Sequence, residues 1–167
     1  MKNLIGIIII ILVIGLGYNG YQFAKKYRHS KRLKFGVGKI RFPKLNLSSL
    51  LTEIPLYIEL EITNFSPTTF EINQISVDVH DENDTLVAEQ KNPLTETLPI
   101  HSNKKTSLPL SYAISPQQLT RLIQHSGGIA KVGANFITTG SYNIPIKLKG
   151  FIVTEGIALD INETITI

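Results

Sequence analysis

The sequence predicts a mostly β protein: an antiparallel β-sandwich with one short helix, preceded by an N-terminal transmembrane helix. Three observations support this prediction. Residues 4–17 carry no charge and would be apolar on every face of a helix. Several later runs alternate apolar and polar residues, which is the period of half-buried strands. Residues 115–128 carry the start and stop signals of a helix.

The apolar run at residues 4–17 is expected to form a membrane anchor. A spanning helix needs ~20 predominantly apolar residues. Uncharged residues continue as far as Ala24, and Tyr18 and Tyr21 suit the membrane interface. A cleaved signal peptide is the alternative, but no small-x-small cleavage site precedes the basic residues that follow. We therefore expect residues 1–24 to be an uncleaved anchor.

Positive charge is concentrated directly after this anchor. Residues 1–34 hold seven of the 17 Lys and Arg and none of the 13 acids, so they carry +7 and the body −3. Six of these cations follow the expected span: Lys25, Lys26, Arg28, Lys31, Arg32 and Lys34. A basic cluster beside a membrane attracts anionic lipid, worth ~1 kcal/mol per residue. We expect these six residues to contact the lipid bilayer. The mildly acidic body gives no reason to expect a nucleic-acid partner.

The same charges predict the topology of a single-pass membrane protein. The positive-inside rule places the side with more Lys and Arg in the cytoplasm. Only Lys2 and the α-amino group precede the span, so the body is expected to be cytoplasmic. An extracytoplasmic or virion location is the alternative, because a cleaved N-terminus or delivery within a virion would bypass this rule.

The body is expected to be one domain over residues 38–167, behind a basic juxtamembrane linker at residues 25–37. The clearest alternation lies at residues 56–62 and 75–79. Further strands are expected near residues 40–42, 86–89, 94–100, 108–114, 142–148 and 157–167. About seven short strands separated by Pro, Asn and Gly turns predict a sandwich of the immunoglobulin or fibronectin type III kind. Gly150 followed by Phe151 is expected to shift the strand phase, as a bulge would.

One helix is expected to interrupt the strands. Ser115 is a good N-cap, Pro116 suits the first helical position, and Gln118 completes a capping box. Apolar residues then follow at helical spacing, namely Leu119, Leu122 and Ile123. The pair at residues 127–128, two glycines, is expected to end the helix.

A polar corner separates the two clearest strands, with the sequence NFSPTT at residues 64–69. Asn64 tolerates left-handed backbone and can bond its own turn, while Pro67 ends ladder pairing. We expect this corner to be structural, a connection between strands.

The order of these segments resembles the late embryogenesis abundant group 2 family, also called the water stress and hypersensitive response domain. The similarity runs through LYIELEITNFSPTTFEINQISVDVHDENDTLVAE, LPIHSNKKTSLPLSYAIS, a helix and YNIPIKLKGFI, and covers about residues 38–167. The Asn-Pro pair of the family is split here into Asn64-Phe65-Ser66-Pro67. The resemblance implies a stress-related protective or structural role without a defined ligand.

Catalytic and metal-binding patterns are weak. The chain has no cysteine, which excludes disulfides, a thiol nucleophile and zinc–thiolate sites. Ser102 and Lys105 match Ser-x-x-Lys but fall in a turn between strands. Asp81, Asn83 and Thr85 are similar to the start of a calcium loop that lacks its glycine and its final Glu. The four histidines are isolated from one another and from carboxylates at ligand spacing. We therefore expect no enzyme, cofactor or metal site.

The sequence leaves two candidate functions. The first is a non-enzymatic, membrane-tethered module that binds or protects something at the membrane surface. The second is a structural component of a larger assembly, an envelope complex or a virion, that docks through its apolar N-terminus. Co-isolation of the full chain with membrane or with a stoichiometric protein partner would separate them.

Overall fold

The computed structural model describes residues 18–45 and 51–167, which fold as a mostly β structure of antiparallel sheets. The strands are β1 (Leu33–Arg41), β2 (Ile54–Asn64), β3 (Phe70–His80), β4 (Leu86–Ala88), β5 (Leu98–Ile100), β6 (Lys105–Ile114), β7 (Pro145–Thr154) and β8 (Ile157–Thr166). The helices are an N-terminal helix, helical over the described residues 18–30, α2 (Pro116–His125) and α3 (Gly128–Thr139). The predicted antiparallel, mostly β class is confirmed.

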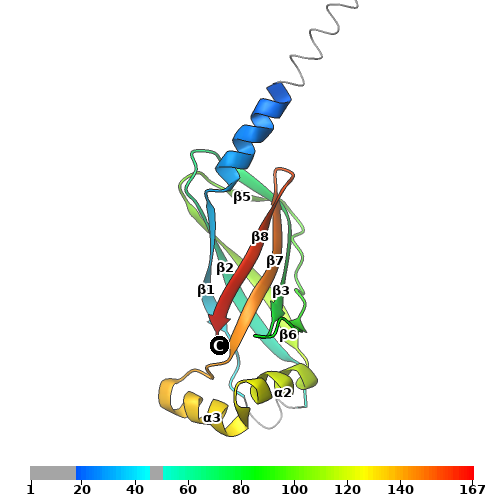
Figure 1. Ribbon diagram of the computed structural model, residues 1–167, viewed down its shortest axis with the longest axis vertical. Coiled ribbons are helices and arrows are strands. Elements are labelled where there is room, and N and C mark those ends of the chain that lie inside the picture. Colours follow the sequence, from blue (N-terminus) through cyan, green and yellow to red (C-terminus); the bar gives the residue numbers. More distant parts are fainter. Residues whose placement is uncertain (1–17, 46–50) are drawn as a thin grey trace, which may run out of the picture.

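Two sheets form the body (Figure 1). The three-stranded sheet has the order β1-β2-β6, and the five-stranded sheet has the order β4-β3-β7-β8 with β5 also paired to β3. The N-terminal helix projects from one end of the elongated body, and α2 and α3 lie at the opposite end (Figure 1). The basic N-terminal segment and the helices α2 and α3 therefore lie at opposite ends of the molecule.

The core lies on the inward faces of the strands. Every second residue of β2 is buried from Ile54 to Asn64, and β7 buries Ile146, Leu148, Ile152 and Thr154 in the same way. Burial of this kind removes apolar surface from water at roughly 25 cal/mol per Å². The alternation predicted for residues 56–62 and 75–79 is confirmed.

The helix predicted after Ser115 is confirmed with its capping box. The Ser115 side chain accepts from the backbone N–H of Gln118, and the Gln118 side chain accepts from the backbone N–H of Ser115 at 3.0 Å. The expectation of one short helix is wrong, because α3 follows at once. Gly127 takes a left-handed conformation with φ +99°, which turns the chain from α2 into α3 instead of ending helical structure.

Strand β1 begins earlier than the domain boundary expected at residue 38. Leu33 is buried, and Phe35 and Val37 are partly buried against the core. Residues 33–37 therefore belong to the sheet. The inward phase then changes at a bulge between Val37 and Ile40, where the register with β2 shifts.

The phase shift expected at Gly150 is wrong. Strand β7 keeps an unbroken register with both neighbours there, opposite Val77 of β3 and Ile161 of β8. The irregularity lies in the partner strand instead, between Ile72 and Gln74. Gly150 serves a close approach: a Cβ at this position would lie 1.9 Å from the carbonyl oxygen of Ser76.

The membrane anchor expected at residues 1–24 falls mostly outside the described residues. Over the described ranges, 18–45 and 51–167, no helix has both the length and the apolar character that a bilayer crossing requires.

Candidate functional site

The six cations singled out from the sequence lie together at the N-terminal end of the body. Three of them, Lys25, Lys26 and Arg28, are on the N-terminal helix. The other three follow it through the turn into β1, namely Lys31, Arg32 and Lys34. All are exposed except Lys26, which is partly buried.

Four exposed aromatic side chains lie on the same helix, three of them before these cations and one, Tyr27, among them. Tyr18 and Tyr21 are 62% and 65% exposed, and Phe23 and Tyr27 are about half exposed. Tyr18 and Tyr21 are three apart and precede Lys25 and Arg28 by helical spacings, so the four share one face. The helix thus presents Tyr18, Tyr21 and Phe23 first and positive charge nearer the body, and each of these three side chains is more than half exposed.

Three contacts fix the base of this helix on the body. Lys26 forms an ion pair with the carboxylate of Glu155, in the turn between β7 and β8. The backbone N–H of Phe65 donates to the carbonyl of Arg32 at 3.2 Å. At the same corner, the ring Nδ1 of His29 lies 3.1 Å from the hydroxyl of Thr68. The base of the helix is therefore held by two connections, the corner between β2 and β3 and the turn between β7 and β8.

The corner that receives the helix is organised by the buried side chain of Asn64. Its Oδ1 accepts from the backbone N–H of Ser66 at 2.9 Å and from the Ser66 hydroxyl at 2.7 Å. Its amide donates to the carbonyls of Thr68, Ile100 and His101. Bonding within its own turn was expected. The left-handed backbone that Asn tolerates is not used here: Asn64 ends β2, and the left-handed non-glycine residues of the described chain lie elsewhere.

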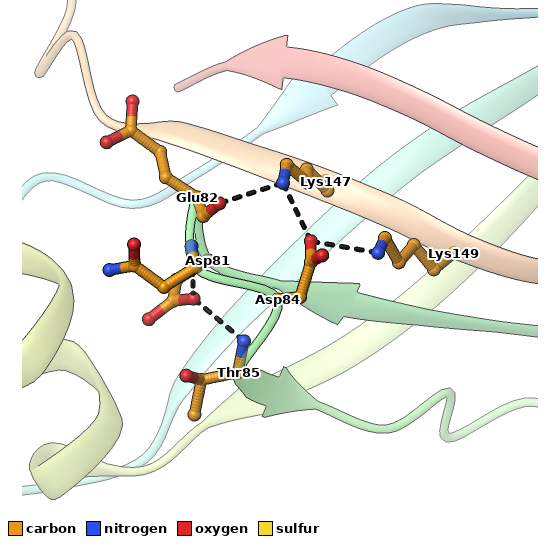
Figure 2. Close-up of polar contacts among 7 residues, drawn as sticks. Asp81, Glu82, Asp84, Thr85, Lys147 and Lys149 are labelled. Atoms are coloured by element: carbon orange, nitrogen blue, oxygen red, sulfur yellow. Dashed lines mark hydrogen bonds and ion pairs between the residues drawn. The ribbon is translucent and has the colours of Figure 1, made fainter.

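The pattern that resembled a calcium loop is a tight hairpin between β3 and β4 (Figure 2). Asp81 Oδ1 accepts from the backbone N–H groups of Asn83 and Thr85 at 2.9 and 2.8 Å. Its other oxygen lies 3.3 Å from His125 Nδ1, within ion-pair range but without hydrogen-bond geometry. No group of three metal-ligating side chains occurs in the described ranges.

Asp84 ties this hairpin to β7. Its carboxylate lies 2.7 Å from Lys147 Nζ and 2.8 Å from Lys149 Nζ, and Lys147 also donates to the carbonyl of Glu82 (Figure 2). Hydrogen bonds from Lys147 and then Lys149 lower the pKa of Asp84 to about 2. The charges around this hairpin therefore serve the strand contact.

The Ser-x-x-Lys pattern does not form a catalytic pair. Asn103, between its two residues, has a left-handed φ of +53°, as a tight turn requires. Lys105 Nζ lies 2.5 Å from the carboxylate of Glu61 on the outer face of the three-stranded sheet. Sequence reasoning missed the roles of Glu155 and Thr68, because each meets the basic segment only through the fold.

Comparison with known proteins supports the fold alone. No protein-family model matches the chain, and no curated protein matches it. Among solved structures, a glycosyl hydrolase family 2 member from Bacteroides cellulosilyticus is 11% identical with a TM-score of 0.50; the match covers 81% of this chain and only 15% of that one. Northeast Structural Genomics Consortium target SoR45 gives 10% identity, a TM-score of 0.45 and coverages of 80% and 84%. A FixG-related protein from Vibrio parahaemolyticus is 11% identical with a TM-score of 0.40, and the match covers 81% of this chain and 95% of that one.

Proposed function

We propose that the chain is a non-enzymatic module tethered to a membrane, in which an N-terminal single-pass helix carries an immunoglobulin- or fibronectin III-like β-sandwich. The observation that best supports this proposal is the order of exposed side chains along the N-terminal helix. Tyr18 and Tyr21 come first, and the cations from Lys25 to Lys34 follow. Aromatic rings favour the membrane interface, and Lys and Arg favour the adjacent anionic headgroups.

The six cations differ in what they offer to lipid. Lys26 is engaged by Glu155, and Lys31 Nζ lies 4.7 Å from the centre of the Tyr27 ring. Lys25, Arg28, Arg32 and Lys34 have no ion pair to an acid in the described part of the chain. At ~1 kcal/mol per cation near an anionic surface, these four supply most of the attraction. The proposed contact is therefore electrostatic and weakens as salt rises.

We further propose that the module belongs with the late embryogenesis abundant group 2 proteins and has a stress-related binding or protective role. The proposal rests on the order of the sequence segments that carry the resemblance. The corner organised by Asn64 lies within these segments, but it departs from the family pattern, because the Asn-Pro pair of the family is split here.

Membrane tethering is tested by fractionating cells that express the full chain. The protein is expected to stay in the membrane pellet after alkaline carbonate extraction, which removes peripherally bound proteins. Recovery in the supernatant would overturn the tether. A variant with Gln at residues 25, 28, 32 and 34 is expected to remain in the pellet, because the apolar segment supplies the anchoring.

Headgroup contact is tested on the full chain in nanodiscs, with and without phosphatidylserine. Amide exchange over residues 25–34 is expected to slow when the anionic lipid is present. The Gln variant should lose this difference, whereas a control with Gln at the distant Lys91 and Lys131 should keep it. Equal exchange in both lipids would contradict the contact while leaving the tether intact.

The cytoplasmic location follows from the charge order and is tested with external protease. Translocating six cations directly after the span opposes the orientation preference. We therefore expect the domain to resist protease on intact cells and to be digested after lysis. Digestion without lysis would place it outside the cytoplasm.

The second candidate function, a component of a larger assembly, is favoured by the opposite end of the molecule. Ile129 and Ile137 of α3 are 65% and 85% exposed. An apolar surface of this kind suits a protein contact. A stoichiometric protein partner that co-purifies with the wild-type chain, and is lost on Ile137→Asp, would support this alternative.

A further inference from the structure

Two of the sheet edges are closed by side-chain amides that imitate a strand. At β6, the Asn92 side chain donates to the carbonyl of Pro109 at 2.8 Å and accepts from the backbone N–H of Ser111 at 2.7 Å. At β3, Gln90 Oε1 accepts from the backbone N–H of Val77 at 3.0 Å, between the stretches covered by β4 and β5. These amides block the addition of another strand.

The edge of β1 has no such cover. The hydrogen bond from the Phe65 N–H to the carbonyl of Arg32 shows that the backbone polar groups of Arg32 point toward β2. Because these groups alternate in direction along a strand, those of Lys34 and Gly36 also point toward β2. The N–H and C=O groups of Leu33, Phe35 and Val37 therefore point away from β2, toward the free edge. In the described chain β1 pairs with β2 alone, and these outward groups have no hydrogen-bond partner. The N-terminal half of β1 lies apart from β8, the nearest edge strand of the other sheet (Figure 1).

Unpaired cations line the outer face of β1. Lys34, Lys39 and Arg41 are exposed, form no ion pair with any described acid, and share the strand with no acidic residue. Lys39 and Arg41 also line a surface hollow of about 290 Å³ with Tyr57 and Glu59. Glu59 offsets only one of the two charges. An edge with these charges repels a second copy of itself and attracts an acidic strand.

We propose that the free edge of β1 is a docking site for an extended acidic segment of a partner protein. The segment adds to the three-stranded sheet by backbone hydrogen bonds to Leu33, Phe35 and Val37. Its acidic side chains, at every second position, face Lys34, Lys39 and Arg41. The proposal shares only Lys34 with the six cations assigned to lipid; Lys39, Arg41 and the backbone edge lie outside that set, so the docking site is distinct from the proposed membrane contact.

The test uses the full chain in nanodiscs of zwitterionic lipid, so that lipid charge does not compete. The probe is a blocked synthetic peptide, Thr-Glu-Val-Glu-Val-Glu-Val-Thr, carrying a fluorophore. Binding is measured by fluorescence anisotropy, and amide exchange is followed by NMR. At saturation the amides of Phe35 and Val37 are expected to exchange about tenfold more slowly, as new backbone hydrogen bonds protect them.

Variants of the protein and the peptide separate strand addition from simple charge attraction. Lys39→Gln with Arg41→Gln should weaken binding about fivefold or more, because two facing ion pairs are lost. Lys91→Gln with Lys131→Gln, a matched loss of charge elsewhere, should leave it unchanged. A peptide with Pro in place of two central Val cannot pair as a strand and should not bind. The proposal is overturned by absent binding, by unslowed exchange at Phe35 and Val37, or by equal binding of either the Pro peptide or the Lys39/Arg41 variant.

Discussion

The side-chain amide of Asn64, at the end of β2, donates a hydrogen bond to the carbonyl of Ile100 in β5 at 3.2 Å. This bond joins the three-stranded sheet to the five-stranded sheet. Asn64 is fully buried, so water cannot replace the bond.

Asn64→Ala is therefore expected to lower the free energy of unfolding by about 3 kcal/mol, because several buried polar groups lose their partner at once. The measurement is urea denaturation followed by tyrosine fluorescence, since the chain has no Trp. Asn92→Ala is the matched control: its amide also bonds backbone groups, but at an exposed edge, so a loss of only ~1 kcal/mol is expected. Equal losses would contradict the role given to burial.

The N-cap of α2 offers a second test. Ser115→Ala should cost about 1 kcal/mol, because the backbone N–H of Gln118 loses its side-chain acceptor. Ser115→Asp keeps an acceptor oxygen and should retain most of the stability. An unchanged denaturation midpoint in Ser115→Ala would show that the cap contributes nothing.

Gly150 tests the close approach of β3 and β7. In Gly150→Ala the new Cβ would fall 1.9 Å from Ser76 O and 2.7 Å from Val77 Cα, both backbone atoms of β3. The strands must separate, and a loss of about 2 kcal/mol or more is expected. Gly133→Ala in α3 is the control, because its Cβ meets nothing within 4 Å and the helix should gain up to ~1 kcal/mol. Equal stability of the two variants would contradict the close approach of β3 and β7 at Gly150.

Asp84 makes the hairpin contact sensitive to acid. Its folded pKa is about 2, below the ordinary value near 3.8, because Lys147 and then Lys149 bond the ionised carboxylate. The stabilisation is therefore present above about pH 4 and is lost as pH falls through about 2. Carboxyl NMR should show Asp84 titrating near pH 2. In a variant with Lys147→Gln and Lys149→Gln the titration should move up toward the ordinary value, and an unmoved titration would contradict the assignment.

Local features of the fold could be predicted from the sequence. The alternation of β2 and the capping box of Ser115 and Gln118 are properties of adjacent residues, and both are confirmed. Helix α3 was missed because Gly127 and Gly128 match a helix stop, although the left-handed Gly127 only redirects the chain. The early start of β1 was missed because basic residues and glycines interrupt its apolar positions.

Features that depend on pairing could not be predicted in this way. A bulge was expected at Gly150, whereas the register shifts of the described strands lie at residues 37–40, 72–74 and 79–80. Register belongs to two strands at once, so one strand's composition does not determine it. The contacts of the basic segment could not be predicted either. Its residues were identified from the sequence, but Glu155, the partner of Lys26, is 129 positions away in the chain.

The N-terminal helix leads directly into β1, and β1 lies along β2 for most of its length. Hydrogen bonds between antiparallel strands are perpendicular to the strands. A pulling force that enters through the helix along the strand direction would therefore load the β1–β2 bonds together in shear, instead of opening them one after another. The attachment of Lys26 to Glu155 spreads part of the same force into the other sheet. The β1–β2 pairing would therefore resist such a force more strongly than a strand pair that is opened from one end.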